Sequence, residues 1–158
     1  MSRAPLREPD TADLADLDQQ VGYVLRRAQL AVFADFIAGQ TGVVATPGQF
    51  AVLAVVGRNP GLSQSRLCEL LGIKRANLVA VIDHLESLDL VRRDPSVTDR
   101  RSNRLQLTAA GDRALKRAIE DEARHEARVT RLLGAGGRAA LLKQLAKLCE
   151  LDSSRSFP

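Results

Sequence analysis

Residues 91–111 read "VRRDPSVTDRRSNRLQLTAAG" and place five arginines beside only two aspartates in a short stretch. Two segments with strand-like composition, 91–93 and 104–107, flank a polar loop at 94–103. Thr108 then stands directly before an Ala- and Leu-rich segment, where a hydroxyl can accept the first free amide of a helix. The stretch predicts a β-hairpin with a basic tip, followed at once by a helix.

Two helices are expected upstream of this hairpin. "TPGQFAVLAVVG" (46–57) combines Thr46, Pro47 and Gln49 in the pattern of a capping box with proline at the first helical position. Ser63 then caps a short helix that Gly72 ends. The helical period resumes in residues 73–90, with an apolar side formed by Leu78, Val81, Ile82, Leu85 and Leu88. Two helices joined by a glycine turn form a helix-turn-helix layout.

The apolar side of the second helix leaves polar residues on its other side. These are Lys74, Arg75, Asn77, Ala80 and His84. In a major groove, Lys and Arg can pair with guanine, Asn can pair with adenine, and Ala can contact a thymine methyl group. An ordinary solvated helix face would have a similar composition, so the helix pair alone leaves both interpretations open.

The hairpin favours DNA binding. A strand, a basic loop and a second strand directly after such a helix make a winged helix, and arginines at its tip suit the negative potential of a minor groove. We expect Arg100 and Arg101 to make this contact and Asp99 to orient them through a charge-assisted hydrogen bond. The remaining arginines of the stretch are expected to hold the wing or to contact phosphates. They are Arg92, Arg93 and Arg104.

The rest of the chain is predicted to be helical. Long helices are expected over about 14–38, 109–133 and 138–151, around a DNA-binding winged helix at about 46–107, with a mobile arm at 1–12 and a loose tail at 152–158. The fold class is therefore mainly α with a small β-wing. The outer helices carry more apolar surface than a small winged domain needs, which predicts a homodimer with a shared helical base.

Composition narrows the class of protein further. The chain has 158 residues, 45% of them hydrophobic, and a net charge of +4, which suits one domain with a polyanionic partner such as double-stranded DNA. Two cysteines make no disulfide framework, and no apolar run is long enough to span a bilayer, so we expect a cytoplasmic protein with no membrane partner. The sequence shows neither a nucleophile–base pair nor a phosphate-cradling glycine loop, so no enzyme activity and no cofactor are expected.

No metal site is expected either. His84 and His125 fall on different predicted helices, and His125 lies in the charged run "EDEARHEAR", which we expect to be solvated.

The order of these elements, together with "DRRSNRLQLT" (99–108), resembles the MarR family of winged helix-turn-helix regulators. "HLESLDLVRRDP" (84–95) is similar to the segment that leaves the recognition helix in that family, with Asp89 where glycine is usual. Aspartate tolerates the left-handed backbone that glycine would adopt there, though less well. The resemblance covers about residues 14–151.

The resemblance implies a homodimeric repressor that pairs through its first helix and last two helices and binds a pseudo-palindromic operator. It also implies release by a small molecule, with an aromatic carboxylate or an acyl- or aryl-coenzyme A thioester as the best candidates. Such a ligand would bind where the helical base meets the winged domain, and Tyr23, Arg27 and Phe50 are candidate pocket residues.

Two alternatives remain open from the sequence. One is a redox-sensing repressor that uses Cys68, expected to be buried at the contact of the two helices, or Cys149, expected against the dimer base. The other is a winged-helix module that binds another protein.

Overall fold

The structure is a computed structural model and describes residues 15–95 and 103–151. The chain divides into two units, residues 1–32 and 33–158. The first unit contains the 3-10 helix η1 (Leu17–Gln19) and most of helix α1 (Val21–Ala38), and the second contains every other element. Within the described ranges, no helix has the length and apolar character needed to cross a bilayer.

Helix α1 begins later than the sequence predicts. We expected a helix from residue 14, but the regular α-helix starts at Val21, after η1. Ala15 and Asp16 have positive φ angles of 47° and 61°, and a left-handed backbone cannot continue a right-handed helix. The predicted end near Gly39 is confirmed, since α1 stops at Ala38.

The predicted helix starts are confirmed in the second unit. Helix α2 (Pro47–Arg58) opens with the capping box, in which the Thr46 hydroxyl accepts from the Gln49 amide at 3.2 Å and the Gln49 side chain accepts from the Thr46 amide at 3.1 Å. The Ser63 hydroxyl caps helix α3 (Gln64–Leu71), which ends at Gly72 with a φ of 61°. The Thr108 hydroxyl accepts from the Gly111 amide at 2.9 Å and caps helix α5 (Ala109–Leu133).

Helix α4 (Arg75–Ser87) buries most of its predicted stripe. Leu78, Ile82 and Leu85 are buried, and Val81 is half-buried. The prediction for Leu88 is wrong: its side chain is 38% exposed. The helix ends at Ser87 and Leu88 is its C-cap, so this side chain leaves the helical period of the other four.

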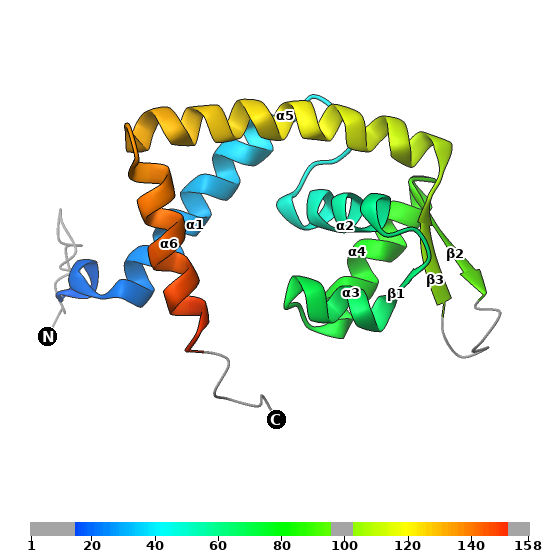
Figure 1. Cartoon of the computed structure of the whole chain (residues 1–158), viewed down its shortest axis with the longest axis horizontal. Coiled ribbons are helices and arrows are strands. Elements are labelled where there is room, and N and C mark those ends of the chain that lie inside the picture. Colours follow the sequence, from blue (N-terminus) through cyan, green and yellow to red (C-terminus); the bar gives the residue numbers. More distant parts are fainter. Residues whose placement is uncertain (1–14, 96–102, 152–158) are drawn as a thin grey trace, which may run out of the picture. The chain divides into compact units, whose positions relative to one another are not determined.

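The hairpin forms as predicted, with longer strands and a third partner. Strand β2 (Val91–Pro95) pairs antiparallel with β3 (Asn103–Leu107), with Val91 opposite Leu107 and Pro95 opposite Asn103. The short strand β1 (Leu62–Ser63) pairs with the other edge of β3, and the sheet order is β1-β3-β2. Figure 1 shows α2, α3 and α4 gathered beside this sheet.

One apolar core joins these elements. It includes fully buried side chains from α2, α3, α4 and both hairpin strands: Val52, Leu53, Val56, Leu67, Leu78, Ile82, Leu85, Val91 and Leu105. The core holds α4 from one side only, which leaves its opposite side at the surface.

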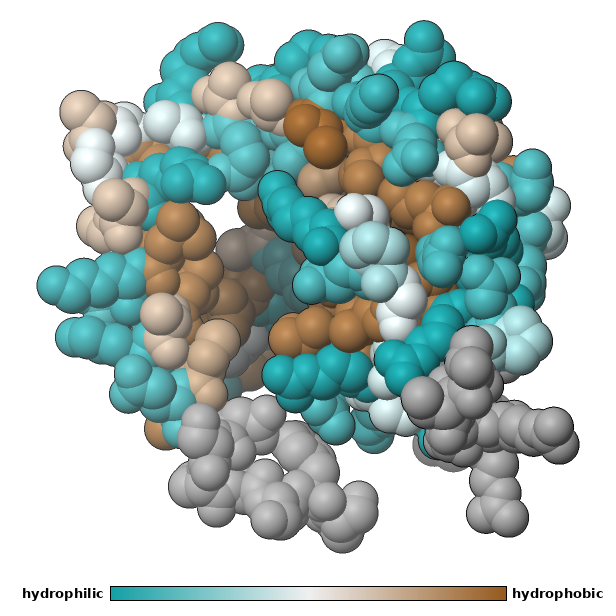
Figure 2. Space-filling view, turned by 45° about the vertical axis from the view of Figure 1, so that its right-hand side comes forward, coloured by the Kyte–Doolittle hydropathy of each residue, from teal (hydrophilic) through white to brown (hydrophobic). Residues whose placement is uncertain are grey.

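The outer helices expose large apolar side chains. Helix α6 (Gly137–Cys149) exposes Leu141, Leu142 and Leu148 by 43%, 50% and 37%, and α1 exposes apolar side chains from Val21 to Ile37. Figure 2 shows hydrophobic residues at the surface among hydrophilic ones. A single chain therefore leaves part of its apolar surface in contact with water.

Candidate nucleic-acid interface

The exposed side of α4 contains the five residues predicted to read DNA. Lys74, Arg75, Asn77, Ala80 and His84 are all exposed, on the side of the helix that the core does not touch. Lys74 is the N-cap residue but makes no side-chain capping bond. Among the described residues, Lys74 and Arg75 form no salt bridge. Their charges are thus available to a partner at the start of the helix.

Arg93 fastens the hairpin to α4. From strand β2 its guanidinium donates to Asp83 at 2.5 Å and to Glu86, both on α4. The Arg93 side chain is only 19% exposed, so this pair of contacts is partly shielded from solvent. The contacts fix where the hairpin leaves the helix.

Arg92 and Arg104 brace the hairpin itself. Arg92 donates to Gln106 across the strand pair at 2.8 Å and to Asp94 at 3.2 Å. Arg104 donates to the carbonyl oxygen of Gly61, just before β1, at 3.1 Å. The sequence left two roles open for Arg92, Arg93 and Arg104, holding the wing or contacting phosphates. All three make contacts that hold the wing.

The predicted tip of the wing lies outside the described residues. Asp99, Arg100 and Arg101 all fall in the range 96–102, so their roles stay predictions.

Asp89 has the left-handed backbone expected where the family has glycine, with a φ of 55°. The Leu90 amide donates to the Leu85 carbonyl at 2.9 Å, and the Thr108 hydroxyl donates to the Asp89 carbonyl at 2.5 Å. The turn therefore links the end of α4, the start of β2 and the cap of α5.

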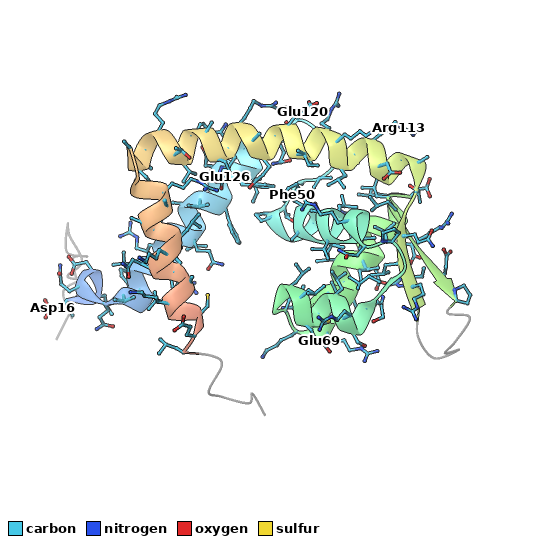
Figure 3. All side chains as sticks on the ribbon, in the orientation of Figure 1. Asp16, Phe50, Glu69, Arg113, Glu120 and Glu126 are labelled. Atoms are coloured by element: carbon cyan, nitrogen blue, oxygen red, sulfur yellow. The ribbon has the colours of Figure 1, made fainter. Side chains whose placement is uncertain are left out.

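The three candidate ligand residues fall in different units. Arg27 lies over the Tyr23 ring, 6.0 Å from its centroid, and both belong to the first unit. Phe50 is half-buried on α2 in the second unit, where α2 packs against α5 (Figure 3). Its ring centroid is 6.1 Å from that of Phe36. A shared pocket for the three residues stays a prediction.

His125 is buried, which corrects the expectation of a solvated residue. It is 3% exposed, its ring lies edge-on to Phe36, and its Nδ1 is 2.7 Å from the Asp35 carboxylate. Hydrogen bonds from Arg128 and His125 lower the pKa of Asp35. The sequence signal that we missed is the spacing of Ala118, Asp121 and His125, which places them on one face of α5.

A second contact joins α5 to the segment after α1. The Thr41 amide and hydroxyl donate to the buried Asp121 carboxylate at 2.9 Å and 3.0 Å. Burial raises the pKa of Asp121, but the hydrogen bonds from Thr41 and the charges of Arg124 and Arg117 outweigh it, and the net shift is downward.

The cysteines differ from each other in exposure. Cys68 is half-buried and packs against the core rather than being fully buried, and Cys149 is exposed at the end of α6. Within residues 15–95 and 103–151, no group of histidine, cysteine and carboxylate side chains could hold a metal ion.

Comparisons with known proteins find transcriptional regulators. A family model described as "MarR family" matches residues 45–102. A putative transcriptional regulatory protein for the hcr operon of Thauera aromatica is 36% identical over 154 residues, which is 92% of each chain.

Solved structures of the transcriptional repressor CouR are also similar. CouR bound to a 23-mer DNA duplex is 44% identical, with a TM-score of 0.81 over 89% of this chain and 99% of CouR. CouR bound to p-coumaroyl-CoA is 40% identical, with a TM-score of 0.80 over 93% of this chain and all of CouR.

Proposed function

Since this chain belongs to the MarR family of transcriptional regulators, we propose that it is a homodimeric repressor, released from its operator by a small-molecule ligand. The family consists of DNA-binding regulators and not of enzymes. The observation that carries the proposal is the exposed start of α4, where Lys74, Arg75 and Asn77 project from a helix whose other side is buried in the core.

In the proposed complex, α4 lies in the major groove. Arg75 and Lys74 are suited to guanine O6 and N7, and Asn77 to adenine N6 and N7. Ala80 would contact a thymine methyl group, and His84, further along the helix, would lie near a phosphate. Arg100 and Arg101 of the wing would enter the minor groove, with Asp99 orienting them. The repressor CouR, 44% identical to this chain, has been solved on a DNA duplex, which supports this assignment.

The apolar side chains exposed on α1 and α6 support the homodimer. Leu142 of α6 and Val21 of α1 are 50% and 64% exposed, and burying such side chains against a second copy is favourable by about 25 cal/mol per Å² of apolar area. Two copies would present two recognition helices to successive turns of one face of the duplex.

The proposed effector is an aromatic carboxylate or its coenzyme A thioester. CouR, which is 40% identical in its p-coumaroyl-CoA complex, supports this class of ligand. Tyr23, Arg27 and Phe50 are proposed to supply a phenol, a partner for an anion and an aromatic wall. The ligand would act by favouring a spacing of the two recognition helices that does not match the grooves.

Selection from a random duplex library, followed by fluorescence anisotropy at several salt concentrations, tests the proposal. We expect one enriched pseudo-palindromic sequence and an affinity that falls steeply as salt rises. Arg75→Ala and Asn77→Ala should each change the preferred base and cost about 1–3 kcal/mol per lost bidentate contact. Arg101→Ala should weaken binding without changing the oligomeric state.

Arg131→Ala is the matched control, because Arg131 is an exposed arginine on α5, away from α4 and the hairpin. Its affinity should equal that of the wild type. Equal losses in Arg75→Ala and Arg131→Ala, with no change in base preference, would contradict the assignment of α4 as the reading helix.

A further inference from the structure

Lys74 is the lysine of the proposed DNA interface in a chain that otherwise uses arginine. Four of the 23 basic residues of the chain are lysines, and the rest are arginines. Lys116 lies on α5, and Lys143 and Lys147 lie on α6, whereas Lys74 is the N-cap residue of α4. A lysine amine forms a stable, uncharged amide with an acyl donor, and an arginine keeps its charge. Lys74 is therefore the residue of this face whose positive charge a stable acylation would remove.

The Lys74 side chain is accessible to a reagent. It is exposed, and it makes no capping bond at the start of α4. In the ranges that the structure describes, it forms no salt bridge that would hold the ammonium group in place. No salt bridge of the described residues has to break before this amine reaches an acyl donor.

The surroundings of Lys74 in the sequence carry positive charge. Arg75 follows it directly, and the chain has no acidic residue between Glu69 and Asp83. Both of those carboxylates already form salt bridges, at 2.7 Å and 2.5 Å, with arginines of α3 and β2 (Figure 3 labels Glu69). An acyl donor that carries a phosphate group is therefore attracted to the start of α4.

Lys116 of α5 is also exposed but has the opposite surroundings. Asp112 and Glu120 are four residues before and after it, which places both on its side of the helix. Their negative charges repel an anionic acyl donor. Lys116 thus provides a comparison of the same chemical group on another helix of this chain.

We propose that Lys74 is an acylation site, at which an acyl phosphate switches off DNA binding; the switch rests on the proposed function of α4. The Lys74 amine, after it has given a proton to water, attacks the acyl carbonyl carbon. A C–N bond forms as the bond from that carbon to the phosphate oxygen breaks, and inorganic phosphate leaves with the electron pair of the broken bond. The second proton of the attacking nitrogen passes to water, and the product is a neutral amide.

The neutral amide weakens the contact with DNA in two ways. It lacks the ammonium donors that pair with guanine O6 and N7. It also removes one positive charge per chain from the surface that faces the duplex, so binding depends less steeply on salt. We expect the affinity for the selected operator to fall roughly tenfold or more.

Treatment of the full chain with acetyl phosphate tests the proposal. Peptide mass spectrometry then measures acetylation at each lysine, and fluorescence anisotropy measures affinity for the operator. Acetylation should be greater at Lys74 than at Lys116. It should decrease at Lys74, but not at Lys116, when the operator duplex is bound before treatment.

Three variants assign the loss of affinity to Lys74. Lys74→Arg has no lysine amine at this position, so its affinity should be the same before and after treatment, whatever its value. Lys74→Gln has a neutral amide, as acetyl-lysine has, and should bind about as weakly without treatment as the treated wild type. Lys116→Arg is the matched control and should lose affinity on treatment as the wild type does.

A Lys74→Arg chain that loses as much affinity on treatment as the wild type would overturn the proposal, because another lysine would then be responsible. Lys74 left unmodified while Lys116 reacts would also overturn it, and so would equal acetylation of Lys74 with and without the duplex. An untreated wild type that binds no duplex would contradict the proposed function and the switch, whereas the mass spectra would still decide whether Lys74 is the acylation site.

Discussion

Asp89 occupies a left-handed backbone position that glycine adopts without strain. Its φ is 55°, and for a residue with a β-carbon this conformation costs free energy. We therefore expect Asp89→Gly to raise the free energy of unfolding by about 0.5–1 kcal/mol. Thermal denaturation should show a higher midpoint, by roughly 2–4 °C per kcal/mol for a chain of this size. Asp89→Ala is the matched variant and should melt below the wild type, whereas a glycine variant that also melts lower would contradict this account.

Gly111 is required by a close backbone approach at the start of α5. A β-carbon there would fall 1.9 Å from the carbonyl oxygen of Leu90, which also accepts the Thr108 amide. Neither backbone can move without disturbing the turn, so Gly111→Ala should lower the free energy of unfolding by about 1–3 kcal/mol or more.

Gly48→Ala is the control for Gly111→Ala in chemical denaturation. It adds the same methyl group inside α2, where the nearest atom would be 4.0 Å away. This variant should be at least as stable as the wild type. Equal stability of the two alanine variants would show that the Leu90 contact is not restrictive.

Among the helices and strands, Arg93 of β2 connects the hairpin to α4, the helix proposed to read DNA. Its contacts with Asp83 and Glu86 are partly exposed, so Arg93→Gln should cost about 1 kcal/mol or less of stability. Under the proposed function, the loss in DNA affinity should be roughly fivefold or more, because β2 would no longer hold the wing at a set angle to α4.

Anisotropy and denaturation on the same samples separate these two effects of Arg93→Gln. Arg66→Gln is the control, since it breaks the exposed pair with Glu69 on α3 and leaves the hairpin unchanged. If both variants lost the same DNA affinity, the contact between α4 and β2 would have no special role.

The last turn of α1 and the segment after it are joined to α5 by two carboxylates. The pKa of Asp35 and that of Asp121 are both lowered in the folded state, from an ordinary value of 3.8. A lowered carboxylate pKa stabilises the fold above the unfolded pKa, and this contribution is lost as the pH falls through the folded pKa. The free energy of unfolding should therefore fall as the pH drops below about 4.

Asp121→Asn removes one of these two groups. We expect it to lower stability at neutral pH, because Thr41 and Arg124 lose a charged acceptor, and to flatten the dependence of stability on pH below about 4. Urea denaturation over that acid range measures both effects. A variant with the acid dependence of the wild type would show that Asp121 does not contribute to it.

At the scale of the whole molecule, the apolar side chains on the outer helices point to a second copy. Leu142 of α6 is 50% exposed, and a lysine there would place a charge in the proposed interface. Leu142→Lys should shift sedimentation from dimer to monomer at micromolar concentration. Leu70→Lys, at an equally exposed leucine of α3, should remain dimeric. Two variants with the same sedimentation would place the interface elsewhere.

Features that depend on interactions within a few residues of each other could be predicted from the sequence. Thr46, Ser63 and Thr108 cap helices because a hydroxyl reaches an amide three residues later in the chain. The period of Leu78, Ile82 and Leu85 settled which side of α4 is buried, and so which side is left for Lys74, Arg75 and Asn77.

Features that join distant segments could not be predicted from the sequence and appear first in the folded chain. His125 meets Asp35, and Asp121 meets Thr41, because folding brings α5 against the end of α1 and the segment that follows it. Strand β1 has two residues, too few for a pattern, and exists only through its hydrogen bonds to β3. A cavity of about 410 Å³ beside Arg113 and Arg117 likewise needs walls from segment 40–44 and from α5. Interactions between residues close in sequence can be predicted from the sequence, whereas contacts between distant segments depend on how the whole chain folds.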